Sequence, residues 1–141
     1  MTEAIGLDTN VLVRYYVDDA TDALTERQRA IARKLIESGR PLAIAKTVIL
    51  ELEWVLRGYY GFEASEIGRV FTHLLSQPHI RIEDRAAVEH AVSGHAAGMD
   101  FADALHHSSY GDCKSVATFD DRRFARRSRR LGLSPGVTVP R

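Results

Sequence analysis

The sequence predicts an α/β fold: a three-layer α/β/α domain with a mostly parallel sheet of four or five strands. Short apolar runs bounded by turn residues recur along the chain, and such runs are typical of buried strands. Segments with apolar residues at helical spacing separate these runs. Strands that alternate with helices form parallel sheets covered on both faces. With 141 residues and ordinary hydrophobic and charged fractions, the chain is predicted to form one domain over residues 1–141.

The first half of the chain shows two strand patterns and four helix patterns. The first strand ends at Leu7, and Asn10 is suited to cap the helix that follows. Thr25 and Gln28 form a capping-box pattern for the second helix, after a polar loop at 18–22. The first helix is predicted to run through residue 16, and the second helix to end near 38–39. A strand at 41–45, a helix over 47–61 and a further helix ended by Pro78 follow.

The second half continues the alternation. A strand is predicted at 79–82, and Asp84 and Asp100 are suited to cap the next two helices. The first of these breaks at Gly98. A fourth strand at 115–119 precedes an arginine-rich helix closed by Gly132, and 137–139 can add a fifth strand.

Composition narrows the function classes. Cys113 is the one cysteine, so neither an intrachain disulfide nor a cysteine metal site is expected. No apolar run reaches the ~20 residues of a membrane span and no signal pattern opens the chain, which together predict a cytoplasmic protein without membrane contact. The net charge is zero, but six arginines crowd the segment 122–130.

Acidic residues follow strands or open helices at several places. Asp8 ends the first strand, Asp120 and Asp121 end the fourth, and Asp103 lies in the first turn of a helix. Glu51 lies one turn into the helix after the second strand. Because ligands collect beyond the carboxyl ends of parallel strands, these side chains are expected to gather at one rim of the sheet.

A cluster of carboxylates needs a compensating cation. Close carboxylates raise one another's pKa, and Mg²⁺ is a hard cation that prefers oxygen ligands. Such sites commonly serve phosphoryl chemistry. The chain has no glycine-rich phosphate loop, which argues against nucleotide hydrolysis of that kind.

Each carboxylate also has a structural interpretation. Asp8, Asp100 and one of Asp120 and Asp121 can cap helices, and Asp103 suits the positive end of a helix. Glu51 and Glu53 flank the same apolar stripe, so periodicity alone does not choose between them.

The ordered set of motifs resembles the PIN-domain family, and specifically the VapC-type toxins of bacterial type II toxin–antitoxin systems. The motifs are Leu7-Asp8-Thr9-Asn10, the helix at 51–56, Phe101-Ala102-Asp103-Ala104-Leu105 and Thr118-Phe119-Asp120. The resemblance spans essentially the whole chain. It implies a metal-dependent endoribonuclease in which Mg²⁺ or Mn²⁺ is held by Asp8, Glu51, Asp103 and Asp120, with Asp121 as the alternate for the last position.

The resemblance also implies a mechanism and partners. RNA would be hydrolysed by a metal-activated water, without a covalent enzyme intermediate. A cognate antitoxin would hold the enzyme inactive, and the toxin would be a homodimer. Asp100 would tune the site from behind the metal ligands, and Thr9 and Thr118 would either orient carboxylates or serve the fold alone.

The arginine segment offers point contacts for RNA phosphates, although it can equally be a solvated helix face. The arginines assigned to RNA are Arg122, Arg123, Arg126 and Arg127. Trp54, Tyr59 and Tyr60 are expected in the core or at a dimer contact, with base stacking as an open alternative that no pattern supports. His106 and His107 are expected in a buried or capping role. Other functions stay open: a PIN-type nuclease in RNA maturation or DNA cleavage, a catalytically idle interaction module, and a haloacid-dehalogenase-like phosphatase, against which Asn10 argues.

Overall fold

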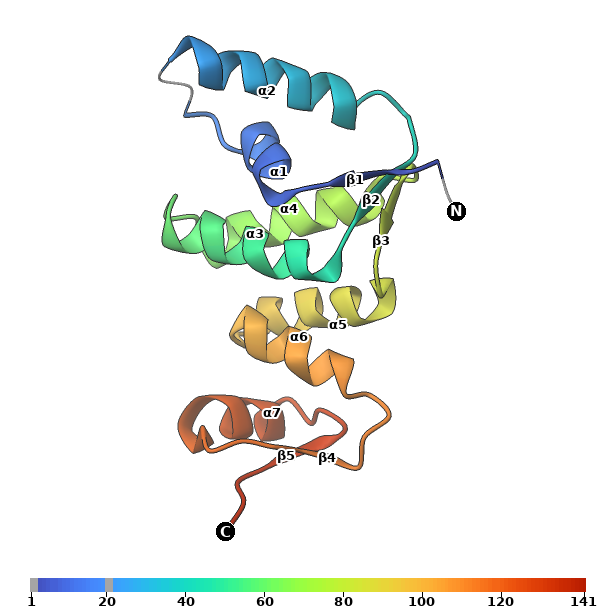
Figure 1. Cartoon of the computed structure of the whole chain (residues 1–141). Coiled ribbons are helices and arrows are strands. Elements are labelled where there is room, and N and C mark those ends of the chain that lie inside the picture. Colours follow the sequence, from blue (N-terminus) through green and yellow to red (C-terminus); the bar gives the residue numbers. More distant parts are fainter. Residues whose placement is uncertain (1–2, 20–21) are drawn as a thin grey trace. The chain divides into compact units, whose positions relative to one another are not determined.

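The computed structural model describes residues 3–19 and 22–141 (Figure 1). The chain forms two compact units, Met1–Arg85 and Ala86–Arg141. Two residues of the predicted loop at 18–22, Ala20 and Thr21, lie outside the described residues. Among the described residues, no helix combines the length and the apolar character that crossing a membrane requires.

The first unit is built on a parallel three-stranded sheet. Its order is β1-β2-β3, and Leu7, Ile44 and Ile82 share one register at the ends of the strands. Helix α1 packs against α2 and α3, and α4 packs against α3 and β3. The elements are β1 (Ile5–Leu7), α1 (Thr9–Tyr16), α2 (Ala23–Ile36), β2 (Leu42–Ile44), α3 (Lys46–Gly58), α4 (Ala64–Ser76) and β3 (Ile80–Ile82).

The second unit pairs two helices with a small parallel sheet of its own. Strands β4 and β5 are adjacent, with Val116 opposite Val137. Between them the chain forms a π-helical turn, η1, in which the Ala125 N–H donates to the Asp120 carbonyl, and a short helix. The elements are α5 (Arg85–Ala96), α6 (Phe101–Ser109), β4 (Ser115–Ala117), η1 (Asp121–Ala125), α7 (Arg126–Arg130) and β5 (Gly136–Thr138).

The alternation of strands and helices is confirmed, but the single sheet is not. A strand is present at every predicted place, yet the strands form a three-stranded and a two-stranded sheet instead of one sheet of four or five. Each strand has three residues, so it offers few ladder hydrogen bonds. An apolar run predicts that a strand exists, but it does not encode which strand will pair with it.

Two predicted helix caps are also corrected. Asp8, not Asn10, caps α1, because its side chain accepts from the Thr9 N–H. Asp22, not Thr25, caps α2: its Oδ1 atom accepts from the Thr25 N–H at 2.8 Å. In both helices the chain is already helical at the residue that the pattern marked as the cap. The predicted cap of α6 is confirmed, because Asp100 Oδ1 accepts from the Asp103 N–H at 3.0 Å.

Candidate active site: carboxylates of the two units

An open hollow of about 340 Å³ lies along α1 and α3 in the first unit, and we call it the α1–α3 groove. Asp8 and Glu51, both predicted as metal ligands, line it together. Its complete lining is Asp8, Thr9, Asn10, Val13, Arg14, Glu51, Val55, Tyr59 and Tyr60. Residues far apart in the sequence therefore present two carboxylates to one hollow.

The two carboxylate oxygens of Asp8 differ in their hydrogen bonding. Its Oδ1 atom accepts from the Thr9 N–H at 2.8 Å, which fixes the carboxylate at the start of α1. The side chain is exposed. One oxygen thus holds the carboxylate in place, and the other is not used in that bond. The capping interpretation of Asp8 and a ligand role are therefore compatible.

The two glutamates of α3 lie in different surroundings. Glu51 is exposed and lines the groove. Glu53 is buried, and its Oε2 atom lies 2.8 Å from Nε of Arg57. The structure thus separates two residues that helical periodicity could not, because it gives Glu53 a partner inside its own helix.

Thr9 brings a buried hydroxyl to the same groove. The residue is 5% exposed, and its Oγ1 atom has no hydrogen-bond partner among the described residues. Leaving a buried hydroxyl unpaired costs about 1–3 kcal/mol. A polar atom in this position beside Asp8 fits a groove that takes up water or an oxygen-rich ligand.

In the second unit, Asp103 lies among like charges. Burial raises the pKa of the Asp103 carboxyl, and the negative charges of Asp100 and Asp120 raise this pKa further. The positive charges of His106 and Arg127 oppose the shift without reversing it. Two of the predicted site residues, Asp100 and Asp120, therefore act electrostatically on a third, Asp103, within this unit.

Asp120 and Asp121 have different partners. The Asp120 N–H donates to Thr118 Oγ1 at 3.0 Å, and Asp120 Oδ1 accepts from the Arg123 N–H at 2.9 Å. Asp121 forms an ion pair with Arg129 at 2.8 Å. Of these two aspartates, only Asp120 is among the charges that act on Asp103. These contacts favour Asp120 as the carboxylate that faces the site and assign Asp121 to a surface ion pair.

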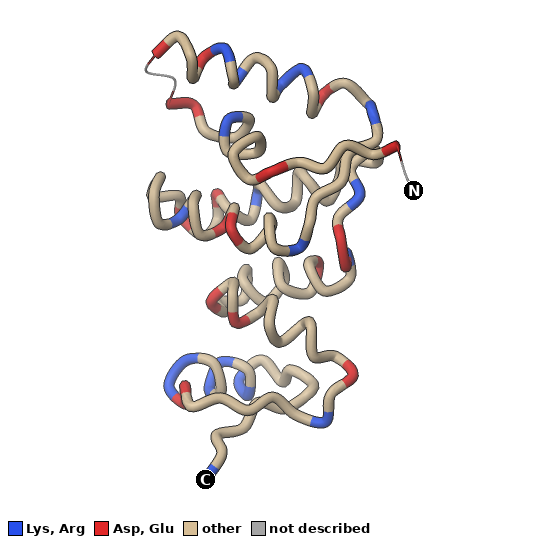
Figure 2. Tube along the Cα trace, viewed as in Figure 1, with Lys and Arg blue, Asp and Glu red and all other residues tan. Residues whose placement is uncertain are grey.

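The arginine-rich segment covers η1 and α7, where Figure 2 shows basic residues close together. Arg122, Arg123 and Arg126 are exposed, whereas Arg127 is half-buried and acts on Asp103. Arg129 is held by Asp121. The segment therefore presents exposed cations on the second unit, one arginine that acts on Asp103, and one that is already paired.

The two histidines after Asp103 differ in burial. His107 is buried, and its Nε2 atom lies 2.7 Å from the Pro135 carbonyl oxygen. His106 is exposed and near enough to Asp103 to act on its pKa. The buried role predicted for His107 fits its contact with the chain before β5.

The core position expected for Trp54 and Tyr59 is wrong, whereas the dimer contact stays a prediction. Tyr59 is 77% exposed and Trp54 is 62% exposed, so neither is a core residue. Tyr59 and Tyr60 line the α1–α3 groove. One sequence pattern indicates this position: Glu51, Val55 and Tyr59 recur every four residues and so share a helix face.

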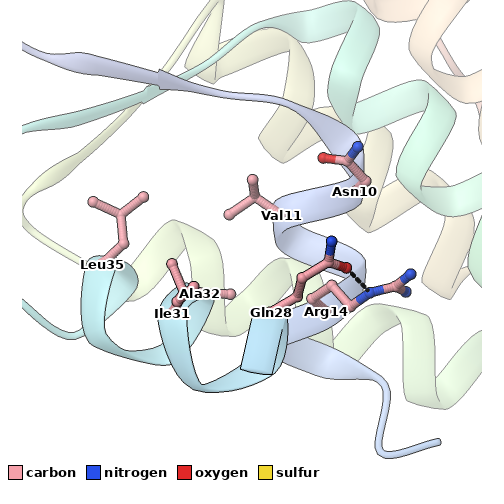
Figure 3. Close-up of a pocket in the computed structure, with 7 residues that line it drawn as sticks. All are labelled: Asn10, Val11, Arg14, Gln28, Ile31, Ala32 and Leu35. Atoms are coloured by element: carbon pink, nitrogen blue, oxygen red, sulfur yellow. Dashed lines mark hydrogen bonds between the residues drawn. The ribbon is translucent and has the colours of Figure 1, made fainter. Parts of the chain in front are cut away.

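A second hollow lies on the other side of α1, between α1 and α2 (Figure 3). Val11, Ile31 and Leu35 point into it, and no carboxylate lines it. Arg14 lines both hollows, and its Nε atom donates to Gln28 Oε1 at 2.9 Å (Figure 3). Of the two hollows beside α1, only the α1–α3 groove is lined by carboxylates.

The donors present suit a hard divalent cation. They are carboxylate and hydroxyl oxygens, the ligands that Mg²⁺ and Mn²⁺ prefer. Among the described residues, no three His, Cys, Asp or Glu side chains form a group arranged to hold a metal ion. The fit thus rests on the chemistry of the donors and on the unpaired hydroxyl of Thr9.

Comparison with known families gives one match. A family model described as the PIN domain matches residues 5–130, which is most of the chain. No curated protein matches it significantly. The match includes the α1–α3 groove, Asp103 and Asp120, and it ends at the last arginine of α7.

Proposed function

Because the chain belongs to the PIN-domain family, a family with a nuclease-type fold, we propose that it is a metal-dependent endoribonuclease that hydrolyses RNA phosphodiesters. The observation that carries this proposal is the shared position of Asp8 and Glu51 in the α1–α3 groove. Two carboxylates in one hollow repel each other unless a cation is present. In the second unit, the negative charges of Asp100 and Asp120 that raise the pKa of Asp103 support the same need for a cation.

In this proposal Asp8 and Glu51 of the first unit and Asp103 and Asp120 of the second would be the ligands of Mg²⁺ or Mn²⁺. The bound cation would supply Lewis acidity, which lowers the pKa of water and offsets charge on phosphoryl oxygens. The hydrogen bond from the Thr9 N–H orients Asp8, and Thr118 orients the backbone of Asp120. The negative charge of Asp100 raises the pKa of Asp103 without Asp100 binding the metal in this proposal. The unpaired Thr9 hydroxyl offers a hydrogen bond to water or to a phosphate oxygen.

The arginine segment is proposed to bind the RNA backbone. Arg122, Arg123 and Arg126 project from the surface, and phosphate contacts of this kind position a substrate without reading its sequence. Arg127 stands closer to Asp103 and is proposed to offset charge near the reacting phosphate.

The test is RNA cleavage by the purified protein. Cleavage should require Mg²⁺ or Mn²⁺ and stop on chelation, and Asp8→Asn or Glu51→Gln should lower kcat by more than about 100-fold. Asp112→Asn, which removes an exposed carboxylate outside both groups, should cleave like the wild type. Equal cleavage with and without a chelator would contradict the metal dependence.

We further propose that the chain is the toxin of a type II toxin–antitoxin pair, with an antitoxin and a second copy of itself as partners. The order of its motifs supports this role, and the exposed apolar side chains Leu24 and Ile31 of α2 support a protein partner. Induced expression should arrest growth, and Asp8→Asn should not. Sedimentation of the isolated protein tests the homodimer, and arrest that persists in Asp8→Asn would contradict the nuclease toxin.

A further inference from the structure

The lining of the α1–α3 groove is aromatic and cationic as well as acidic. Tyr59, Tyr60 and Arg14 line it, and each follows the carboxylate of its own segment, Glu51 or Asp8, along the chain. From Glu51 to Tyr59 the chain advances eight residues along α3, which is about 12 Å at the rise of an α-helix. A stacked nucleic-acid strand rises ~3.4 Å per nucleotide, so the groove spans about three nucleotides.

Tyr59 is held in place although it is exposed. It is the C-terminal cap of α3, and its backbone N–H donates to the Val55 carbonyl at 3.0 Å. Its ring meets that of Tyr60 edge to face, with centroids 4.7 Å apart and planes at 73°. An aromatic ring that is 77% exposed but braced by a neighbour presents a face for stacking at little entropic cost.

Arg14 adds a cation to the same groove. Its Nε atom donates to Gln28 Oε1 at 2.9 Å, and Figure 3 shows its guanidinium beyond Gln28, away from Leu35. That bond does not use the two terminal nitrogens. A guanidinium held in this way can pair with a phosphate oxygen through those nitrogens or lie over a base.

We propose that Tyr59, with Arg14 beside it, forms a subsite for one unpaired base of the RNA substrate, within about three nucleotides of the bond that is cut. The inference rests on the proposed function and deepens it by making single-stranded RNA the substrate class. Every base has a face that can stack, whereas a paired base in a duplex does not expose its face. A nearby phosphate meets Arg14 there instead of the two carboxylates, which would repel it.

The test combines variants of Tyr59 with abasic nucleotides. A single-stranded oligoribonucleotide that the wild type cleaves is made with one abasic nucleotide at each position near the cut. At one position the wild type should lose roughly 5- to 100-fold in kcat/KM, the range for one base stacked on an aromatic side chain. Tyr59→Ala should show the same loss on the unmodified RNA, and the abasic nucleotide should add less than about twofold, because the partner is already missing.

Matched variants separate stacking from other effects. Tyr59→Phe keeps the ring and should stay within about twofold of the wild type. Trp54→Ala removes an aromatic of similar exposure from the same helix but outside the groove, and it should change nothing. Because Tyr59 is exposed, Tyr59→Ala should keep the wild-type melting temperature.

Each other result overturns the subsite. Tyr59→Ala that cleaves like the wild type would show that the ring binds no base. If Tyr59→Ala cleaves more weakly but loses as much kcat/KM as the wild type on the abasic RNA, the ring does not stack on that base. If the variant has an altered oligomeric state, Tyr59 is a protein contact instead. If the wild type cleaves no RNA, the proposed function fails. The subsite is then tested by fluorescence anisotropy of the labelled oligonucleotide, in which equal binding by wild type and Tyr59→Ala would refute it.

Discussion

The Nε atom of Arg57 lies 2.8 Å from Oε2 of Glu53, one turn earlier on α3, and this ion pair separates the roles of the two glutamates on that helix. The Glu53 side chain is 4% exposed and that of Arg57 is 51% exposed. A buried carboxylate is tolerated when it is paired. Glu53 therefore belongs to the fold, and Glu51 is available to the groove.

Arg57→Ala should destabilise the protein, whereas Glu51→Ala should not. Without Arg57 the Glu53 carboxylate stays buried without its ion-pair partner, and we expect a loss of about 1–3 kcal/mol in the free energy of unfolding. Glu51 is exposed, so its removal should change stability by less than about 0.5 kcal/mol. Urea denaturation measures both variants, and equal stabilities would contradict the division of roles.

The charge on Asp103 should destabilise the folded protein at neutral pH. Burial and the neighbouring Asp100 and Asp120 raise the pKa of this carboxyl in the folded state. The favourable contribution of its protonated form is thus present below the ordinary pKa of an aspartate and is lost as pH rises through the raised pKa. Asp103→Asn should therefore melt at a higher temperature than the wild type at pH 7, with little difference at pH 3.

Thermal melting across this pH range gives the result, and Asp112→Asn is the matched control because Asp112 is an exposed aspartate of the same unit. Mg²⁺ should raise the melting temperature of the wild type more than that of Asp103→Asn, because binding to the folded state stabilises it. A variant that melts below the wild type at pH 7 would show that the Asp103 charge stabilises the fold instead.

The sequence predicted the elements of this fold well and their pairing poorly. Strands and helices follow from local patterns, so β1, α3 and α6 lie where apolar spacing places them. The pairing of β4 with β5 depends on which segment the turn at η1 brings alongside, and no periodicity records that. The same limit explains the wrong caps, since Asp22 and Thr25 both suit the start of α2.

The candidate site was predictable to the extent that it depends on strand ends and helix starts. Asp8 follows a strand, and Asp103 opens a helix capped by Asp100, both as expected. The exposure of Tyr59 was not predictable, because an aromatic at the end of an amphipathic helix is more often buried than presented to solvent. Only the position of α1 beside α3 shows that the Tyr59 ring lines a groove.

Removing the cap of α2 should loosen that helix. Asp22 Oδ1 accepts from the Thr25 N–H, and this hydrogen bond lowers the pKa of the Asp22 carboxyl. Its stabilising effect is therefore present above the ordinary pKa of an aspartate and is lost as pH falls through the lowered pKa. Asp22→Ala should speed amide hydrogen exchange in the first turn of α2 at pH 7, whereas Thr25→Ala, which keeps the backbone donor, should change it less. Equal exchange in both variants would return the capping role to Thr25.

Arginines of η1 and α7 should differ in how they affect the binding of RNA. Arg122, Arg123 and Arg126 are exposed, whereas Arg129 is paired with Asp121 at 2.8 Å. Each arginine that neutralises a phosphate of single-stranded RNA contributes about 0.7 to the slope of log K against log salt concentration. Arg123→Ala and Arg126→Ala should each reduce that slope by about this amount, and Arg129→Ala should reduce it less because its charge is already offset within the protein.

Fluorescence anisotropy of a labelled oligoribonucleotide over a range of KCl concentrations measures these slopes, with Asp8→Asn as the background so that the RNA is not cut. The comparison separates binding from folding, since Arg123 and Arg126 are surface residues and their variants should melt like the background protein. Because the salt slope counts phosphate contacts and does not depend on which bond is cleaved, it tests the arginine segment independently of the carboxylates. Unchanged slopes in both variants would make η1 and α7 a solvated surface and leave RNA binding to other residues.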